Sequence, residues 1–418
     1  MRKPETIERL YLDFDGFFAS VHQQITPKLR GKPIGVIPFE TNAASSTVVI
    51  ACSREAKAAG CKNVMRVRDA LDRCPELILV TQRPDWYRRA HNALINEIEC
   101  EIPIETIKSI DELACILGKA DIADPHDLAS RLKLRIAKNI GPYITCSIGF
   151  AANRLLAKIA CKVDKPNGVT IWRPDDMPGP LFKRPMSDIP GIGSKISFRL
   201  MVAGITTIED LYATQPKHLR ALWGNVNGER MWYAIHGYEI FAQPTSRGMF
   251  GHGRVLPPGH RDIERAKEYS RLLLSKAARR MRRDAFFAKS LWLWLNMRSG
   301  VWYKQLELPS VQDEPACLAA LNKLWSLAKK ELAGRPVEII RVGVTLSELG
   351  EPGVRQLDMF LADDDQRQQA EVLTNTVDRL NAKFGKRVVT FGHWSPPPGG
   401  YAGGKISFNR IPSAEDFW

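Results

Sequence analysis

Two short acidic segments of this 418-residue chain carry side chains that could bind divalent metal ions. Asp13 lies near the end of an alternating apolar segment, and Asp111 and Glu112 are adjacent to each other much later in the chain. Carboxylates gathered at strand ends make an oxygen-rich site that suits Mg²⁺ or Mn²⁺. Two such ions about 4 Å apart could activate an attacking hydroxyl and stabilise a leaving phosphate oxygen. The residue types therefore indicate phosphoryl-transfer chemistry, although an acidic pair beside a strand is more often a solvated turn.

The elements around these carboxylates have to bring them together. Alternation over residues 9–15 predicts a strand that carries Asp13 and Asp15 on one face and apolar side chains on the other. Neighbours in a regular strand face opposite ways, so Asp111 and Glu112 can share one metal site only if the backbone bends there.

The remaining pattern divides the chain into several units. Strands and helices over residues 9–172 follow a β-α-β-β-α-β order, which favours an antiparallel-type sheet with helices on one side and residues 31–80 inserted. Helical patterns continue to about residue 240, and the Pro- and Gly-rich residues 242–260 predict a linker. A basic helix, a strand hairpin, another helix, a strand and a last helix at about 366–383 follow. The pattern predicts an α+β multidomain protein.

Composition restricts the partners and the location. The chain has 60 Lys and Arg residues against 46 Asp and Glu, a net charge of +14, and a pI of about 9.4. This surplus favours nucleic acid or an anionic membrane surface as partner, with a merely basic enzyme as the alternative. No apolar run approaches the roughly 20 residues of a membrane span. The eight cysteines form no C-x-x-C pair, so we expect buried thiols in a reducing compartment and a cytoplasmic protein.

Three motifs decide between these interpretations. The segments LDFDGFFASV (12–21), SIDEL (109–113) and SIGFAANRLLAKIACKVDKPNG (147–168) closely resemble the signature segments of the Y-family translesion DNA polymerases, the DinB/UmuC group. The resemblance extends from about residue 9 to about residue 360. It implies an error-prone DNA-directed DNA polymerase that extends a primer 3′-OH with dNTPs over damaged template. One alternative is a catalytically weak DNA- and clamp-binding adaptor, which predicts missing carboxylates, but all three are present. Another is a nucleotide cyclase, which has no reason to carry the DNA- and clamp-binding segments at 189–195, 261–283 and 355–360.

The resemblance also implies a right-handed polymerase architecture, with a ferredoxin-like palm, small fingers, a helical thumb and an α+β little finger. The boundaries that it implies are 1–16 and 84–172 for the palm, 17–83 for the fingers, 173–241 for the thumb, 242–260 for a linker, 261–394 for the little finger and 395–418 for a tail.

Carried over to this chain, the resemblance implies two Mg²⁺ ions, with Mn²⁺ as an alternative, held by Asp13, Asp111 and Glu112. The backbone carbonyl of Phe14 would also touch a metal, and Asp15 is interpreted as structural. Phe18 matches the aromatic steric gate, which lies against the incoming sugar and excludes a 2′-hydroxyl.

The resemblance implies dNTP contacts from Phe17, Phe18, Arg54, Lys57 and Lys165. Arg54 and Lys57 lie in a finger segment where many members of the family have Tyr and Arg, and the EAK form here resembles the UmuC branch. Lys acts as a point charge, whereas Arg can bind two phosphate oxygens at once. The pairing of these finger side chains with individual phosphate oxygens is therefore left open. His22, where a Glu is common, is interpreted as a surface helix position.

Two regions are predicted to grip DNA. The segment IPGIGSK (189–195) resembles a helix-hairpin-helix, in which Gly191, Gly193 and Lys195 would contact a phosphate. The basic helix at 261–283 resembles part of the little finger and offers outward arginines, among them Arg279 and Arg283, although a charged face is often merely solvated. Trp292 and Trp294 are interpreted as core or interface residues rather than base-stacking platforms.

A final motif suggests a protein partner. The segment RQLDMF resembles the peptide by which bacterial polymerases bind the β sliding clamp, and its predicted anchors are Gln356, Leu357, Met359 and Phe360. Met359 replaces the usual Leu. SOS accessory proteins are a further expected partner, and no membrane association is expected.

Overall fold

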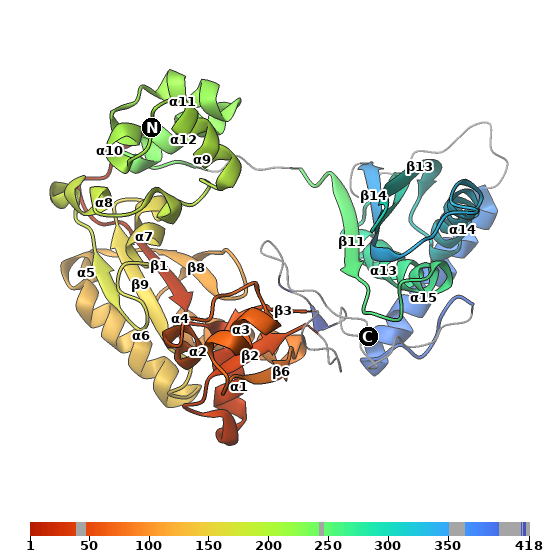
Figure 1. The fold of residues 1–418 in the computed structure, drawn as a ribbon, viewed down its shortest axis with the longest axis horizontal. Helices are drawn as coiled ribbons and strands as arrows, with labels where there is room; N and C mark the ends of the chain where they lie inside the picture. Colours follow the sequence, from red (N-terminus) through yellow and green to blue (C-terminus); the bar gives the residue numbers. More distant parts are fainter. Residues whose placement is uncertain (39–46, 242–245, 351–363, 393–410, 412, 415–418) are drawn as a thin grey trace. The chain divides into compact units, whose positions relative to one another are not determined.

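The computed structural model describes residues 1–38, 47–241, 246–350, 364–392, 411 and 413–414. Contacts divide the chain into two compact units, Met1–Gln243 with Lys405–Ile411 and Pro244–Gly404 with Pro412–Trp418 (Figure 1). No helix among the described residues is long and apolar enough to cross a membrane.

A five-stranded sheet in the order β10-β9-β1-β8-β7 lies at the centre of the first unit. Its strands are β1 (Arg9–Phe14), β7 (Ile104–Ile107), β8 (Glu112–Ile116), β9 (Cys146–Ala151) and β10 (Val169–Ile171). Strand β1 is antiparallel to both β8 and β9. Helix α4 (Pro84–Glu99) connects β1 to β7 through the inserted fingers, and α6 (Pro125–Asn139) connects β8 to β9. This is the β-α-β-β-α-β order that the sequence predicts, and the α+β fold class is confirmed.

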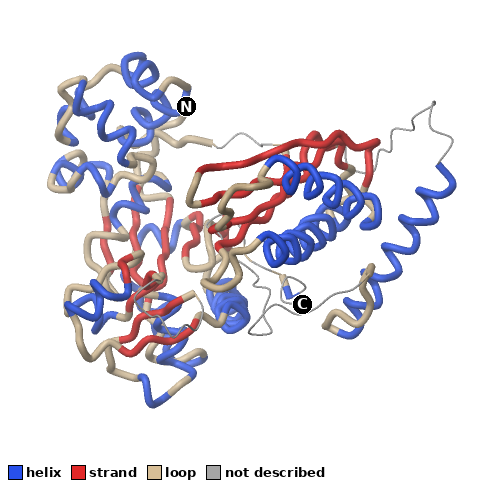
Figure 2. The backbone as a smooth tube through the Cα atoms, turned by 45° about the vertical axis from the view of Figure 1, so that its right-hand side comes forward, coloured by secondary structure: helices blue, strands red, loops and turns tan. Residues whose placement is uncertain are grey.

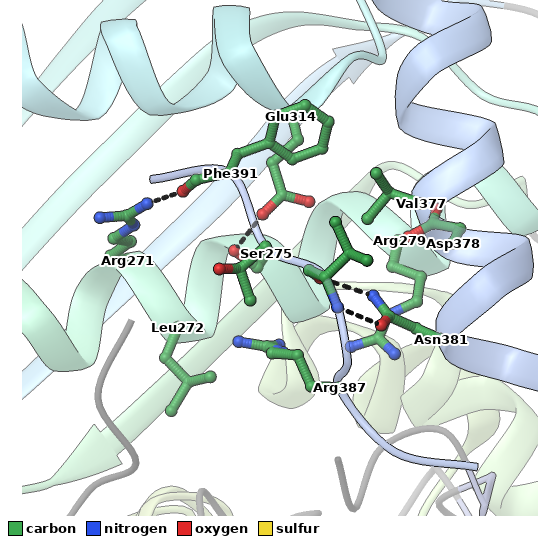
Figure 3. Close-up of a pocket in the computed structure, with 12 residues that line it drawn as sticks. Arg271, Leu272, Ser275, Arg279, Glu314, Val377, Asp378, Asn381, Arg387 and Phe391 are labelled. Atoms are coloured by element: carbon green, nitrogen blue, oxygen red, sulfur yellow. Dashed lines mark hydrogen bonds between the residues drawn. The ribbon is translucent and has the colours of Figure 1, made fainter. Parts of the chain in front are cut away.

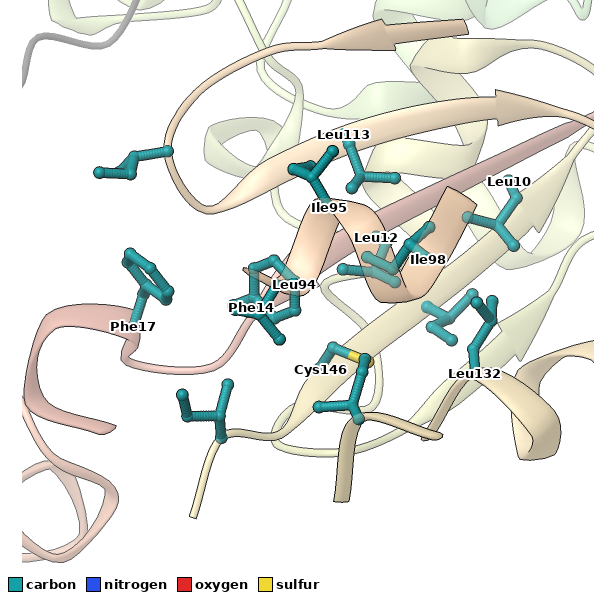
Figure 4. Packing of buried hydrophobic residues seen from close by; sticks show 14 of the residues in the cluster. Leu10, Leu12, Phe14, Phe17, Leu94, Ile95, Ile98, Leu113, Leu132 and Cys146 are labelled. Atoms are coloured by element: carbon teal, nitrogen blue, oxygen red, sulfur yellow. The ribbon is translucent and has the colours of Figure 1, made fainter. Parts of the chain in front are cut away.

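Helices cover both faces of this sheet. On one face, Leu10 and Leu12 pack with Leu94 and Ile98 of α4, as Figure 4 shows. On the other face, Tyr11 lies in a second cluster that includes residues of α7 (Arg154–Ala160). The prediction of helices on one side only was therefore wrong. The sequence pattern missed this because the apolar residues of α7 serve both the sheet and the thumb.

The segment between β1 and α4, which the sequence analysis assigns to the fingers, forms a small insertion. Helix α1 (Phe17–Ile25) leads into them, and they have a separate apolar core. Their elements are β2 (Ile34–Ile37), β3 (Val48–Val49), β4 (Ala51–Cys52), α2 (Arg54–Ala58), β5 (Met65–Arg66), α3 (Val67–Arg73) and β6 (Ile78–Thr81).

The thumb is helical and packs on the sheet face that carries Tyr11. Its helices are α8 (Gly179–Phe182), α9 (Ser194–Val202), α10 (Ile208–Ala213), α11 (Pro216–Trp223) and α12 (Val226–Ile235). A short α5 (Lys119–Ala123) and 3₁₀ turns at Pro27–Leu29, Pro174–Asp176 and Met186–Asp188 complete this unit. The buried side chains of Arg9 and Glu239, 2.9 Å apart, form an ion pair between β1 and the segment after α12.

The second unit is a four-stranded sheet in the order β11-β14-β12-β13 with helices on one side (Figure 2). Its elements are β11 (Met249–Val255), α13 (Ile263–Arg283), β12 (Ala288–Met297), β13 (Gly300–Val311), α14 (Glu314–Glu331), β14 (Ile339–Leu349) and α15 (Asp364–Phe384).

Strand β11 corrects the prediction of a linker. It lies inside residues 242–260, for which the sequence predicts a linker, and it pairs along its whole length with β14. Its Gly253 is opposite Gly343, and the Trp294 indole lies so close to both that a Cβ on either residue would collide with it. Gly253, one of the glycines that suggested a loop, is therefore needed to admit this ring. Trp292 and Trp294 are half-buried on the sheet face opposite the core leucines, which leaves the interface alternative of the core-or-interface prediction.

Candidate active site

The three acidic residues meet at one edge of the first-unit sheet. Asp13 is the register partner of Glu112 on the neighbouring strand β8. Residues 109–111 bend immediately before β8 begins, and the Phe14 N–H donates to the Asp111 carbonyl at 2.9 Å. The bend that a shared site requires is therefore present, and it brings Asp111 beside the end of β1.

Each carboxylate has a partner in the free protein. Asp13 forms an ion pair with Lys165, and the Ser109 hydroxyl donates to Asp111 Oδ1 at 2.5 Å. Glu112 accepts from Lys158 at 2.8 Å and from the Tyr11 hydroxyl at 3.0 Å. Among the residues that the structure describes, no three His, Cys, Asp or Glu side chains are arranged as ligands of one ion. The acidic side chains would have to turn from these partners to share a metal.

The charges of the cluster nevertheless fit a divalent cation. Burial raises the pKa of Asp13 to about 6, and the charges of Asp111 and Glu112 add to the increase while Lys165 opposes it. Burial, with the charge of Glu112, also raises the pKa of Asp111. For Glu112, burial is outweighed by the hydrogen bond and charge of Lys158, so its pKa is lowered. Closely spaced oxygen donors that repel one another are the ligand set that hard cations such as Mg²⁺ prefer.

Asp15 lies near the acidic cluster and accepts three hydrogen bonds. Its carboxylate accepts from Thr145 Oγ1 at 3.0 Å, from Ser147 Oγ at 2.8 Å and from the Asn167 backbone N–H at 2.8 Å. These bonds tie the segment that contains Lys165 to β9 and to the end of β1. Asp15 therefore helps to hold Lys165 beside Asp13.

Two aromatic residues begin helix α1 and occupy different environments. The Phe17 side chain is 3% exposed and lies in the main core, so a nucleotide could reach only its backbone. The Phe18 side chain is half-buried and stacks on the Tyr87 ring at a centroid distance of 4.4 Å. Gly16 caps the helix with φ of 55°, in the left-handed region that favours glycine.

His22 is buried, and its interpretation as a surface position was wrong. Its side chain lies between α1 and α4, 4% exposed, with Nε2 2.9 Å from the Tyr87 hydroxyl. Burial, with the nearby charge of Arg83, lowers its pKa to about 4. Nothing in the residues around His22 indicates this environment, because its partner Tyr87 lies 65 residues away along the chain.

The lowered pKa of His22 leads to a stability prediction. Between pH 6.5 and about 4 the unfolded chain binds a proton at this residue and the folded chain does not, so stability is lost as the pH falls through this range. Between pH 7 and pH 5 the loss is about 2 kcal/mol. His22→Gln keeps a polar partner for Tyr87 but cannot titrate. Urea unfolding of residues 1–243 should therefore lose about 2 kcal/mol less in His22→Gln than in the wild type between these two pH values. Equal losses in both proteins would contradict the assignment.

The cationic side chains of the fingers are accessible. Arg54 and Lys57 are exposed on α2, whose N-terminus is capped by the Ser53 side chain. Lys57 Nζ lies 4.0 Å from the place where a Cβ on Gly16 would stand, which is beside the start of α1. Lys57 and the first turn of α1 thus lie next to each other.

A cleft of about 570 Å³ opens beside Glu112 between the palm sheet and the thumb. Cationic side chains from both sides line it, namely Lys108, Arg154, Lys158 and Arg230. Sequence reasoning missed these residues, although Arg154 and Lys158 lie inside the motif at 147–168. The available signal was their spacing: Arg154 and Lys158 are four residues apart, which places both on one face of a helix.

The hairpin of the thumb has the expected backbone. Gly191 has φ of 97°, Gly193 caps α9, and Lys195 is exposed in the first turn of that helix. Pro190 also lines the cleft, so the hairpin adjoins it.

The basic helix α13 offers fewer outward charges than predicted. Lys276 is 1% exposed, and Arg282 is buried in ion pairs with Asp378 at 2.7 Å and Glu314 at 3.4 Å. Arg279 is half-buried and Arg283 is exposed. Lys276 and Arg282 are therefore not on the outer face of the helix, and Arg282 joins α13 to α14 and α15.

The segment after α15 folds back on α13 and encloses a small pocket (Figure 3). Arg271 donates to the Phe391 carbonyl, and the Asn381 side chain bonds to the backbone of Val388 and Val389. Burial, with the charges of neighbouring arginines, lowers the pKa of Arg387 to about 10. The C-terminal segment thus covers part of the basic face. The predicted clamp anchors Gln356, Leu357, Met359 and Phe360 lie outside the described residues.

A strand-end carboxylate cluster on a split βαβ palm, beside a cationic palm–thumb cleft, is the arrangement of a nucleotidyl-transfer polymerase. Comparisons identify the class. The profile of the impB/mucB/samB family matches residues 12–162, and that of its C-terminal domain matches residues 247–359. DNA polymerase IV of Bacillus velezensis is 30% identical over 91% of this chain and 92% of its own length. DNA polymerase IV of Moorella thermoacetica is also 30% identical, over 91% of this chain and 94% of its own.

Solved structures agree on the fold. A Y-family DNA polymerase chimera of Dbh and Dpo4 superposes with a TM-score of 0.69 and 24% identity, covering 82% of this chain and 99% of the chimera. The chain therefore belongs to the impB/mucB/samB family of DinB-type Y-family polymerases. It is a DNA-directed DNA polymerase of the translesion type.

Proposed function

We propose that this polymerase joins a dNTP to a primer 3′-OH at the Asp13, Asp111 and Glu112 cluster, with two divalent ions and a contact from the Phe14 carbonyl. Polymerases of this family use divalent metal ions. The observation that carries the assignment is the register pair Asp13–Glu112 with the bend at Asp111 beside it. When bound, the metal ions would lower the pKa of the attacking hydroxyl and offset charge on the leaving phosphate oxygen.

Two lysines serve as counter-ions until substrate arrives. Lys165 pairs with Asp13 and Lys158 with Glu112, so two of the three carboxylates have a cationic partner in the free protein. A triphosphate would offer Lys165 a second anionic partner, with Arg54 and Lys57 approaching it from the fingers. The first turn of α1, where the backbone N–H groups of Phe17 and Phe18 have no partner within the helix, would bind phosphate oxygens.

The Phe18 ring would act as the steric gate. It is half-buried and held from behind by Tyr87, so it presents one accessible side. A ring in that position leaves no space for a 2′-hydroxyl on the sugar of the incoming nucleotide.

Primer-template DNA would bind through phosphate contacts. The cations of the palm–thumb cleft and the hairpin at Gly191, Gly193 and Lys195 are the proposed contacts in the first unit. Arg279 and Arg283 are those in the second. We also propose clamp binding through the segment RQLDMF, action with SOS accessory proteins, and a cytoplasmic location, as the sequence suggests.

The direct test of this function is primer extension by the purified chain with Mg²⁺ on two templates, one undamaged and one with an abasic site. The proposal expects template-directed addition on both templates and no 3′-end removal. Failure to extend either primer, with DNA binding intact, would favour the adaptor alternative.

The two proposed contacts on α13 lead to a prediction about salt. If each neutralises a phosphate, the slope of log affinity against log salt should flatten by up to about two in Arg279→Gln/Arg283→Gln, since each duplex contact contributes about 0.9. The matched control is Arg89→Gln/Arg298→Gln, which removes the same charge elsewhere and should leave the slope unchanged. Fluorescence anisotropy of labelled primer-template over a salt series measures both. Equal slopes in the test variant and the wild type would show that Arg279 and Arg283 do not contact phosphates and that the charged face of α13 is merely solvated.

A further inference from the structure

Three side chains from two helices form a continuous contact behind the proposed gate. Phe18 and His22 are four residues apart on α1, which places them on one face of the helix. Tyr87, on α4, lies against both: its ring stacks on Phe18 with an interplanar angle of 27°, and its hydroxyl is 2.9 Å from His22 Nε2. The Tyr87 side chain is fully buried.

The hydrogen bond between His22 and the Tyr87 hydroxyl restricts the orientation of the Tyr87 ring. The hydroxyl is the only polar atom of that side chain, and leaving a buried hydroxyl without a partner costs free energy. Tyr87 therefore stays where His22 can reach it. His22 is itself held, because its ring also lies 5.5 Å from the Trp86 ring and its side chain is 4% exposed.

The position of Phe18 depends on this arrangement. Its inner side rests on the Tyr87 ring, and its other ring neighbour, Phe17, lies 5.9 Å away. A gate excludes a 2′-hydroxyl only if its ring cannot yield, and small displacements of a positioned group have large kinetic effects. A Tyr87 ring that could tilt would let Phe18 move away from the sugar.

We propose that His22 is a positioning residue for sugar selection, and that it acts by holding the Tyr87 ring on which Phe18 rests. This inference depends on the proposed role of Phe18 as the gate. Burial, with the charge of Arg83, keeps His22 neutral at physiological pH because its pKa is about 4. The contact is therefore the same throughout the pH range of an ordinary polymerase assay.

The test uses three variants of the contact. Tyr87→Phe removes only the hydroxyl, His22→Leu removes its partner, and His22→Gln keeps a polar group that can still bond to the hydroxyl. Single-nucleotide incorporation gives kcat and KM for a dNTP and the matching rNTP, and the ratio of their kcat/KM values is the discrimination. Thermal melting of each variant provides the folding control.

We expect His22→Leu and Tyr87→Phe each to lower discrimination by about threefold to tenfold, the range for loss of one hydrogen bond. The change should come mainly from a higher kcat/KM for the rNTP. His22→Gln should recover most of the wild-type discrimination. If dNTP and rNTP incorporation instead fall together and the ratio stays constant in Tyr87→Phe, the contact is only structural and the inference is wrong.

Phe18→Ala, measured in the same series, separates this inference from the function on which it rests. A lower ratio in Phe18→Ala with no change in His22→Leu and Tyr87→Phe would overturn the role of His22 and leave the gate intact. An unchanged ratio in Phe18→Ala would overturn the gate itself, and with it the role of His22.

Discussion

Asp13→Asn is expected to reduce the rate of dNTP incorporation by about 10³-fold or more, equivalent to about 4 kcal/mol of transition-state stabilisation. The substitution preserves the shape of the side chain but removes the charge that a metal ion would bind. Glu112→Gln should act in the same way, because its register position pairs it with Asp13. Single-turnover incorporation at saturating dNTP and Mg²⁺ measures the loss.

Binding of primer-template should change little in these variants, since the carboxylates would hold metal rather than DNA. Asp72→Asn, on the exposed surface of α3, is the matched control and should retain full activity. Substantial incorporation by purified Asp13→Asn would rule out the carboxylate assignment. A parallel loss of DNA affinity and melting temperature would instead indicate a folding defect.

Phe18→Ala is expected to lower the preference for dNTP over rNTP by about 10²-fold, the scale on which an apolar pocket rejects an added hydroxyl. Removing the ring opens the space beside C2′ without touching the carboxylates or the cations. The kcat/KM for the rNTP should rise, and that for the dNTP should change much less. Single-nucleotide kinetics with matched dNTP and rNTP pairs measure both values.

A conservative substitution provides the control for this variant. Phe18→Tyr keeps an aromatic ring at the same place and should retain most of the preference. If Phe18→Ala discriminates as the wild type does, another residue excludes the 2′-hydroxyl.

The elements that hold the carboxylates could be predicted from sequence because their signals are local. Alternation over residues 9–15 predicts β1 and the face on which Asp13 lies, and the structure has both. The bend at Asp111 could be inferred because two adjacent acidic residues cannot share a site on a regular strand. Local periodicity and a simple geometric requirement were sufficient here.

Contacts between distant segments could not be predicted in the same way. The environment of His22 depends on α4, and no pattern within α1 distinguishes a buried histidine from an exposed one. Strand β11 was missed because its glycines are typical of loops, and the reason for one of them, Gly253, is the Trp294 ring of another strand. Both errors concern side chains whose partners lie far away in the sequence.

The lysine partners of the acidic residues could be predicted only in part. Lys165 was identified from its motif as a triphosphate contact, and in the free protein it pairs with Asp13. Lys158 lies in the same motif but was overlooked, since its partner Glu112 is on another strand. A motif can therefore identify functional residues, but it does not show which of them contact one another.

The most direct measurement of the central claim is the number of Mn²⁺ ions bound to the complex with a chain-terminated primer-template and the next dNTP, by electron paramagnetic resonance. Wild-type protein should bind two ions per complex, and Asp13→Asn should bind fewer, with weaker affinity for those that remain. Two ions bound with unchanged affinity in Asp13→Asn would contradict the assignment of the metal site to the Asp13, Asp111 and Glu112 cluster.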